Sequence, residues 1–378
     1  MQKIYRTVLL FGLISLFGDI IYEGSRGLIP SYLYLLGASA VVIGTIAGIG
    51  DLIGYALRSF FGYLSDKKRN YWAFIFIGYF LIISIPFIGL FSSWIIVILL
   101  VIVERIGKAV RGPARDTLLS LISNKKNIGK VFGIHEFFDQ VGAVIGPLVV
   151  GLMMFYTASY KQTFLSLFIP FVLMIIAVFL AYKKFPPRLV QKKPSKVLKK
   201  LSKDFYIYSA GVFFNTLAIL PWSLILLKSS KFLSSNIWLV PIIYMLIQLI
   251  DAPSSLVSGF LYDRFGTKLL FIPFTLAFLP TFLAFQNSLG LVVLSALLYG
   301  LILGMKESIY RAAVSVFSPK NTRGFAYGMF NTLHGIGFLI SGFVYGFFID
   351  VGAAINTIIF FSLSSELLSI ILLLKIRG

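Results

Sequence analysis

The feature that most constrains this chain is a series of apolar runs, each about twenty residues long, that recur from one end to the other. A helix rises 1.5 Å per residue, so about twenty residues are enough to cross a hydrocarbon core of ~30 Å. Hydrophobic residues make up 58% of the chain and charged residues only 13%, against roughly a quarter charged in soluble domains. The sequence therefore predicts an all-α membrane protein.

Twelve such runs can be distinguished, and short polar turns separate them. We predict twelve transmembrane helices over the ranges Thr7–Gly27, Val41–Gly62, Trp72–Phe91, Trp94–Leu119, Lys130–Phe155, Thr163–Tyr182, Phe205–Leu227, Ile237–Phe260, Leu269–Phe285, Gly290–Ala313, Phe325–Phe348 and Ala353–Leu374. A cleavable signal peptide is not expected, because the first run contains charged residues and no small-residue cleavage site follows it.

The net charge of +20 would suggest a nucleic-acid partner in a soluble protein, but here the basic residues follow the apolar runs. They collect at both ends and in every second loop, as in "DKKRN", "KKFPPRLVQKKPSKVLKKLSK" and "DRFGTK", whereas "LGASA" and "FSSW" have none. By the positive-inside rule both termini are cytoplasmic, which requires an even number of crossings. We expect a multi-pass monomer of the cell membrane whose partners are the lipid bilayer and a small-molecule substrate, with no nucleic acid.

The domain organisation follows from one basic, Pro-rich segment and from an internal repeat. We predict a first six-helix bundle over residues 1–183, a cytoplasmic linker over 184–204 and a second bundle over 205–378. "GYLSDKKRN" after the second run has a counterpart in "GFLYDRFGTK" after the eighth. Gly62 and Gly259 lie 197 positions apart, and Gly129 and Gly324 lie 195 apart. Two six-helix bundles with a path between them are typical of secondary transporters.

At these residues the chain resembles the major facilitator superfamily of secondary transporters over essentially its full length. The superfamily's loop pattern Gly-x-Leu-x-Asp-Arg-x-Gly-x-Lys/Arg is matched by Gly259, Leu261, Asp263, Arg264, Gly266 and Lys268. The first copy has Gly62, Leu64, Asp66 and Lys67 but places Arg69 where glycine is expected. The resemblance implies the major facilitator fold of twelve helices in two six-helix bundles.

The loop pattern also implies a cytoplasmic gate. An Asp at the cytoplasmic end of a helix can accept hydrogen bonds from helix N-termini and arginines in one state and release them in the other. The alternative is a basic turn that only sets the topology. We assign to the gate the loop residues Gly62, Asp66, Lys67, Gly259, Asp263, Arg264 and Gly266, and, from the end of the fourth run, Arg111, Arg115 and Asp116.

"GIHEFFDQVGAVIGPLVVG" resembles the fifth-helix motif associated with antiporters in the superfamily. The matching residues are Gly133, Gly142, Gly146, Pro147 and Gly151, and Val150 stands where the motif has another glycine. Small residues along one face let a neighbouring helix approach closely, and proline permits a bend. The Gly-Pro pair favours export over import.

"ERIGKAVRGPARD" in the fourth run partly matches the superfamily's arginine motif on that helix. If the helix enters from outside at Trp94, Arg105 lies roughly 16 Å deep and Arg115 roughly 32 Å deep. Glu104, Lys108, Arg111 and Arg115 fall at i, i+4, i+7 and i+11 and form one stripe. A charge near the midplane needs a wet cavity or a partner, so we expect Glu104 and Arg105 to face the transport cavity.

Other ionisable groups lie at comparable depth. "GDIIYEGSR" in the first run places Asp19, Tyr22, Glu23 and Arg26 on one stripe. We predict a coupling cavity that combines Asp19, Glu23 and Arg26 with Asp51, Glu104, Arg105, Lys108, His135, Glu136 and Asp139. The second half offers cavity residues of mostly neutral character: Asn215, Gln248, Asp251, Asn331, His334 and Glu366.

The mechanism we infer is proton-coupled alternating access with export of a small molecule. A carboxylate in a closed, dry cavity takes up a proton, and a nearby arginine makes it release that proton. Asp19 and Glu23 are the first candidates for this carboxylate and Asp139 the next; the alternative for each is a permanently paired structural charge. No cofactor and no resident metal are expected, the chain has no cysteine, and we expect no enzyme activity.

Three other functions stay open. Organic-anion uptake or exchange would use Lys108 and Arg111, and divalent-metal export would use Asp19, Glu23, His135 and His334 as ligands. A membrane-embedded enzyme would need paired acidic motifs such as Asp-x-x-x-Asp, which the sequence lacks. An ATP-driven pump is disfavoured because no Gly-x-x-x-x-Gly-Lys-Ser/Thr phosphate loop occurs.

Overall fold

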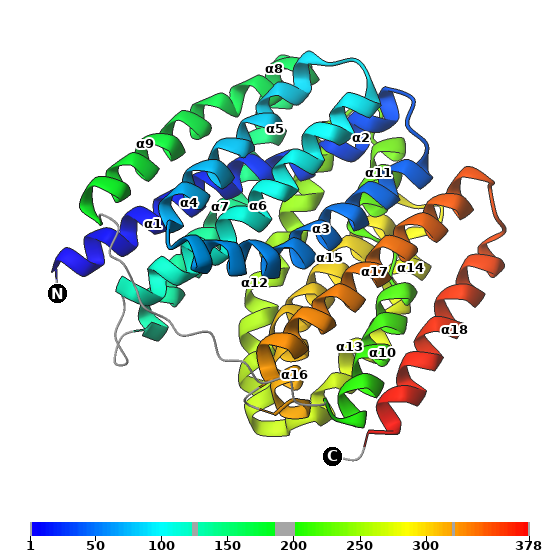
Figure 1. Ribbon diagram of the computed structural model, residues 1–378. Coiled ribbons are helices and arrows are strands. Elements are labelled where there is room, and N and C mark those ends of the chain that lie inside the picture. The colour runs from blue at the N-terminus through cyan, green and yellow to red at the C-terminus, as the bar shows by residue number, and fades with distance from the viewer. Residues whose placement is uncertain (1, 123–127, 186–200, 320–321, 377–378) are drawn as a thin grey trace. The chain divides into compact units, whose positions relative to one another are not determined.

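The computed structural model describes residues 2–122, 128–185, 201–319 and 322–376, and within these ranges it contains helices and turns but no strand (Figure 1). Most of the predicted linker, residues 186–200, lies outside the described ranges, as does the basic loop at 123–127. The all-helical fold class predicted from the apolar runs is confirmed for the described chain.

The helices in chain order are α1 (Gln2–Arg26), α2 (Ile29–Leu35), α3 (Ala40–Lys68), α4 (Tyr71–Phe80), η1 (Leu81–Ile83), α5 (Ser84–Phe87), η2 (Ile88–Leu90), α6 (Trp94–Ile122), α7 (Ile128–Thr157), α8 (Tyr160–Ser166), α9 (Phe168–Lys184), α10 (Lys203–Ala218), α11 (Trp222–Phe232), α12 (Leu239–Phe265), η3 (Gly266–Leu270), α13 (Phe271–Leu276), α14 (Phe278–Ala284), α15 (Leu289–Met305), η4 (Lys306–Tyr310), α16 (Arg311–Phe317), α17 (Arg323–Asp350) and α18 (Ile355–Leu374). The element η4 is a π-helix, and η1, η2 and η3 are 3₁₀-helices.

Ten helical stretches in the described chain are long and apolar enough to cross a membrane. They are Thr7–Leu35, Ala40–Lys68, Tyr71–Leu90, Gly129–Thr157, Tyr160–Lys184, Lys203–Phe232, Leu239–Ala284, Leu289–Phe317, Phe325–Asp350 and Ile355–Leu374. The multi-pass membrane protein is therefore confirmed, whereas the count of twelve crossings stays a prediction.

Several helices predicted as continuous are broken by proline. The run Phe205–Leu227 divides into α10, which ends at Ala218, and α11, which begins directly after Pro221. Similarly, the run Leu269–Phe285 divides into α13 and α14, because Pro280 has no N–H to donate to the carbonyl four residues earlier. Sequence periodicity did not reveal these breaks, since the apolar character continues through them.

The break between α10 and α11 is closed by side chains from three other helices. The carbonyl oxygen of Ala218 accepts hydrogen bonds from Thr281 (2.8 Å), Tyr345 (2.8 Å) and Ser362 (2.6 Å). Thr281 Oγ1 also accepts a hydrogen bond from the backbone N–H of Leu220 at 2.8 Å. Exposed backbone groups at membrane depth are costly, so these hydroxyls permit the break.

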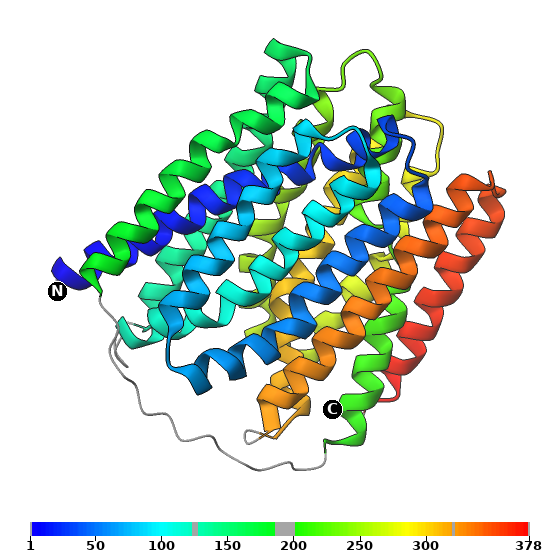
Figure 2. The same cartoon turned by 45° about the horizontal axis from the view of Figure 1, so that its top comes forward.

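The described chain forms two compact units. The first contains residues 1–32, 53–194 and 236–245, and the second contains 33–52, 195–235 and 246–378. In the first unit α1 packs along α7 and α9, and α4 packs along α6; Figure 2 shows the blue α1 beside the green α9. In the second unit α10 packs against α17 and α18, and α14 packs against α15. The predicted half-chain boundaries stay a prediction.

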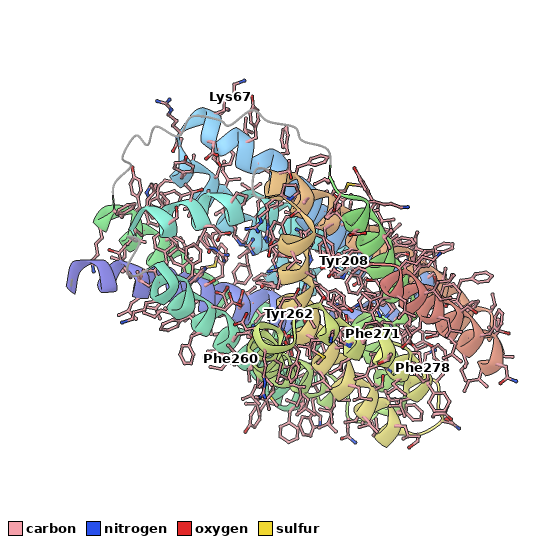
Figure 3. All side chains as sticks on the ribbon, turned by 90° about the horizontal axis from the view of Figure 1, so that it is seen from below. Lys67, Tyr208, Phe260, Tyr262, Phe271 and Phe278 are labelled. Carbon is pink, nitrogen blue, oxygen red and sulfur yellow. The ribbon has the colours of Figure 1, made fainter. Side chains whose placement is uncertain are left out.

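Aromatic side chains from several helices form the core of the second unit. Tyr208 on α10 stacks on Phe330 on α17 at 5.9 Å, and its hydroxyl donates to the carbonyl of Tyr310 at 3.0 Å. Figure 3 labels Tyr208 together with Tyr262 and Phe271, which belong to or pack against the same cluster. Phe260, two residues before Tyr262 on α12 and therefore on another face of the helix, is 75% exposed, as expected for a side chain that meets lipid.

The two copies of the loop pattern share one backbone conformation. Gly266 has φ +60°, and its counterpart Arg69, where glycine was expected, has φ +51°. A non-glycine residue in this left-handed region costs about 1 kcal/mol or more, because Cβ approaches the following carbonyl. The departure from the glycine pattern therefore leaves the turn intact, at a cost in stability.

We predict that Arg69→Gly raises the free energy of unfolding by about 1 kcal/mol, since glycine adopts the left-handed conformation without that penalty. The measurement is the melting temperature of the detergent-purified protein. Lys68→Gln, which removes a neighbouring charge without touching the turn, should leave it unchanged. An equal change of melting temperature in both variants would mean that loss of charge, and not backbone conformation, changes the stability.

For the helix break we predict that Thr281→Val lowers the free energy of unfolding by about 2 kcal/mol, because it leaves the Leu220 N–H buried without a partner. Thr275→Val is the matched control. Thr275 is exposed and bonds only within its own helix, to the carbonyl of Phe271 at 2.8 Å, so its replacement should change the melting temperature little. Indistinguishable melting of the two variants would contradict the role given to Thr281.

Candidate functional site

The first unit contains a buried ion network centred on Glu104 of α6. Glu104 is 1% exposed and lies between two arginines of the same helix, 3.4 Å from Arg105 Nε and 3.3 Å from Arg111 Nη2. Arg111 also donates to the carbonyl of Gly78 on α4 at 3.2 Å. The structure thus pairs Arg111, predicted at the cytoplasmic gate, with the interior carboxylate Glu104. A gating role for Arg111 stays a prediction.

The stripe predicted on α1 contributes a second ion pair. Arg26 Nη1 donates to both carboxylate oxygens of Glu23, at 2.9 and 3.2 Å. Tyr244, from the segment 236–245 of the same unit, donates its hydroxyl to Glu23 in a short hydrogen bond. Glu23 is therefore held by one cation and one phenol, and the sequence analysis did not identify this phenol.

Tyr22 lies among four cations. Its ring centroid is 4.6 Å from Lys108 Nζ and 5.5 to 6.0 Å from the guanidinium carbons of three arginines, Arg26, Arg105 and Arg111. Lys108 also donates to the Tyr22 hydroxyl at 3.3 Å. The negative face of an aromatic ring attracts cations, most strongly where water is excluded. The sequence placed Tyr22 on the stripe but gave no reason to expect this role.

Arg115 joins α6 to α7. Its guanidinium lies 3.0 Å from Asp116 and 3.9 Å from Asp139, and it donates to the Ser15 hydroxyl of α1 at 3.4 Å. Asp139 also lies 3.6 Å from Nδ1 of His135, one turn earlier on α7. Glu136, predicted for the same cavity, is exposed on α7 and acts on Asp139 electrostatically, without an ion pair or hydrogen bond to this cluster among the described residues.

The three carboxylates proposed for proton coupling come together in the first unit. Asp19 is 7% exposed and lies within electrostatic range of Asp139, Glu23 and Lys108. Close packing of α1 on α7 places it there: a Cβ on Gly142 would lie 2.8 Å from the Asp19 Cβ. Asp51 belongs to the second unit and is half-buried.

The antiporter-type motif acts in this structure as a contact surface between helices. A Cβ on Gly142 or Gly146 would lie 2.6 to 2.7 Å from carbonyl oxygens of α1, closer than real Cβ atoms approach. Gly151 contacts the segment 236–245 in the same way, whereas nothing lies near Gly133. Pro147 sits within α7. Three of the four glycines are therefore required for close helix packing.

The structure shows contacts for some of the predicted gate residues in the two loops and leaves the others exposed. A Cβ on Gly62 would meet Pro113 at 3.4 Å, and one on Gly259 would meet the Ser308 hydroxyl at 3.0 Å, so each copy packs on an equivalent helix. Asp66 accepts a hydrogen bond from the Tyr71 hydroxyl at 2.9 Å. Three others are exposed at helix ends: Lys67 (Figure 3), Asp263 and Arg264. A latch formed by these residues stays a prediction.

In the second unit, several predicted cavity residues bond to their own surroundings. Asn215 accepts from the Tyr310 hydroxyl at 2.8 Å and donates to the carbonyl of Pro273 at 3.3 Å. Glu366 accepts the backbone N–H of Phe278 at 2.6 Å, where α13 ends and α14 begins. Other members of the set are Gln248 and Asp251, which are buried on α12, and Asn331 and His334, which are half-buried on α17.

Lys306 is a buried charged residue to which the sequence assigned no role. It is 5% exposed, and its ammonium nitrogen has no hydrogen-bond partner among the described residues. The sequence could have identified it, because a lysine inside the predicted membrane span Gly290–Ala313 is itself an indication of a functional site. Within the part of the chain that the structure describes, no three His, Asp or Glu side chains gather as metal ligands would.

These helices and their charges can be compared with known proteins. The family model of the Major Facilitator Superfamily matches residues 8–342 and 229–376. The chain belongs to the major facilitator superfamily. An uncharacterized protein of Mycobacterium tuberculosis is 32% identical over 99% of this chain and 93% of its own length. An uncharacterized MFS-type transporter of Methanocaldococcus jannaschii is 28% identical over 92% of this chain and 89% of its own length.

Two solved transporter structures share the fold. A crystal structure of a mutant of the nucleoside transporter NupG has a TM-score of 0.76 at 17% identity, covering 98% of both chains. A bacterial homolog of the human lysosomal transporter Spinster has a TM-score of 0.67 at 14% identity, covering 99% of this chain and 95% of its own. The family match and the MFS-type relative assign this chain to membrane transport.

The buried network leads to a stability prediction. Glu104→Gln should lower the free energy of unfolding by about 3 kcal/mol, because it leaves two buried arginines without their countercharge. Adding Arg111→Met to this variant should restore part of the loss in melting temperature. Asp116→Asn, at a side chain 42% exposed, should cost less than about 1 kcal/mol. If Asp116→Asn were as damaging as Glu104→Gln, burial would not explain the effect.

Proposed function

We propose that this chain is a proton-coupled secondary transporter that exports a small molecule by alternating access. The observation that supports it most strongly is a group of three carboxylates with Lys108 within electrostatic range: Asp19 and Glu23 are buried, and Asp139 is half-buried. Ionisable groups inside membrane spans are costly and usually serve ion or substrate pathways. In a soluble protein such charged groups could simply face water, but these groups lie within membrane-spanning helices.

The proposed chemistry is competition between a proton and a neighbouring cation for one carboxylate. Glu23 is bound by Arg26, whereas Asp19 makes no ion pair with any described residue. We therefore place Asp19 first as the proton carrier, with Glu23 and Asp139 as its electrostatic partners. When the cavity closes, Asp19 takes up a proton; when a cation approaches, it releases the proton.

For the topology we propose twelve crossings, with both termini in the cytoplasm of a cell-membrane monomer. The stretch Leu239–Ala284 has 46 residues, enough for two crossings of about twenty residues each. Helix α6, with 29 residues, is also long enough to cross, and three of its charged residues, Glu104, Arg105 and Arg111, are buried. Alternating basic loops support the orientation.

Export is proposed from the fifth-helix motif, and organic-anion uptake or exchange is the second candidate. The anion alternative is favoured by the four cations around Tyr22, where Lys108 has no carboxylate within ion-pair distance in the described chain. Divalent-metal export gains no support from the described side chains. A membrane-embedded enzyme gains none from the comparisons, which name transporters.

The test begins with a melting screen of the purified protein against lipophilic cations, organic anions and divalent metals, since ligands that bind the folded state stabilise it. The stabilising compound is then added to proteoliposomes that contain a pH-sensitive dye. We predict that the wild type couples its transport to proton movement and that Asp19→Asn abolishes the proton signal, because the carboxylate that exchanges the proton is gone.

Asp204→Asn is the matched control, because Asp204 is a carboxylate in the first turn of α10 that belongs to neither the predicted cavity nor the predicted gate, so its replacement should leave proton flux unchanged. The ligand-induced melting shift should persist in Asp19→Asn, which separates a loss of coupling from a loss of binding. Undiminished proton flux in Asp19→Asn, Glu23→Gln and Asp139→Asn together would rule out this mechanism.

A further inference from the structure

Lys306 occupies an unusual position in the second unit. It begins the π-helix η4, which interrupts the membrane-spanning stretch Leu289–Phe317 between α15 and α16. π-helical turns within α-helices occur frequently at functional sites. Its ammonium is buried and makes no hydrogen bond with any residue in the described ranges. A buried lysine charge in a membrane span costs several kcal/mol unless a partner compensates it.

The surroundings of Lys306 are aromatic rather than acidic. Its Nζ lies 5.5 Å from the ring centroid of Phe338 and 5.9 Å from that of Tyr310. His334 stacks on Phe338 at 4.9 Å, and its buried Nε2 has no hydrogen-bond partner in the part of the chain that the structure describes. Two nitrogen groups that can bind an anion therefore lie beside the same aromatic ring.

The carboxylate that acts electrostatically on Lys306 is occupied elsewhere. Glu366 on α18 acts on Lys306 electrostatically but lies beyond ion-pair distance. Its oxygen accepts the Phe278 N–H at 2.6 Å, which satisfies the break between α13 and α14. Glu366 is thus committed to the backbone and leaves Lys306 without a direct counterion among the described residues.

The internal repeat allows the surroundings of Lys306 to be compared with those of its counterpart in the first half. Helix α6 and the stretch Leu289–Phe317 each have 29 residues and begin 195 positions apart, so Lys306 corresponds to Arg111. In the first unit, Arg111 pairs with Glu104 at 3.3 Å. At the same offset the second half has Tyr299 in place of Glu104 and His334 in place of Asp139. Both halves therefore have a cation at the first of these positions. At the other two positions the first half has a carboxylate, and the second half has none.

We propose that Lys306 and His334 bind the carboxylate of a small aromatic organic anion, and that Phe338 and Tyr310 pack against its ring. The anion supplies the countercharge that the protein does not provide. This inference rests on the proposed transport function and names its substrate class. A lipid phosphate could offer similar anionic oxygens, so the test separates a solute from a lipid headgroup.

The test uses the full-length protein in a neutral detergent and benzoate as the probe, with the uncharged benzamide as its matched analogue. We expect benzoate, but not benzamide, to raise the melting temperature. Lys306→Met should increase the apparent Kd for benzoate about tenfold or more, since one buried charge pair contributes at least ~1.4 kcal/mol. His334→Gln should weaken benzoate binding less, and Lys306→Arg should retain it.

Lys228→Met is the control variant. Lys228 belongs to the same unit and also lies over an aromatic ring, 4.2 Å from that of Phe285, but on α11. Its replacement should leave benzoate binding unchanged. Without ligand, Lys306→Met should melt at the same temperature as the wild type or higher, because it removes an uncompensated buried charge. If Lys306 were required for folding, Lys306→Met would instead melt at a lower temperature than the wild type.

Three outcomes would overturn the proposal. The first is equal stabilisation by benzoate and benzamide, and the second is an undiminished benzoate shift in Lys306→Met. The third is stabilisation by added phosphatidylglycerol alone, lost in Lys306→Met, which would assign the site to a lipid headgroup. Because melting measures binding without proton flux, failure here leaves the result for Asp19→Asn unaffected, and the two hypotheses are tested separately.

Discussion

The constraint on which the rest of this structure depends is that the membrane interior offers no water to polar groups. Each backbone group and each charge at that depth needs a partner within the protein. At the break between α10 and α11, hydroxyls from α14, α17 and α18 supply those partners. In α6 the partners of Glu104 are arginines of the same helix. Both solutions place polar side chains inside a chain that is otherwise apolar.

The two halves of the repeat meet this constraint differently. The first unit balances its cations against carboxylates and the ring of Tyr22. In the second unit the cation Lys306 lies near two aromatic rings. Glu366, which acts on it electrostatically, accepts a backbone hydrogen bond at a helix break. This asymmetry supports a division of labour in which the first half exchanges protons and the second half contacts the substrate.

Much of the fold was predictable because the membrane imposes a simple pattern on the sequence. Apolar runs gave the helical class, and the spacing of Gly62 and Gly259 gave the repeat. The α1 stripe brought Asp19 and Glu23 to the same region as Asp139, as expected. The breaks at Pro221 and Pro280 were not anticipated, because apolar character hides a helix end whose backbone is satisfied by distant hydroxyls.

The sequence by itself determined the all-helical membrane class of the protein, its alternating basic loops and most of the charges that must lie within the membrane. Those properties depend on composition and spacing, which are local. Only the tertiary structure decided which charges are paired: Arg111 with Glu104, Glu23 with Arg26 and Tyr244, and Lys306 with no carboxylate at ion-pair distance in the described chain. Pairing depends on distances between helices, and helical spacing along one chain cannot specify them.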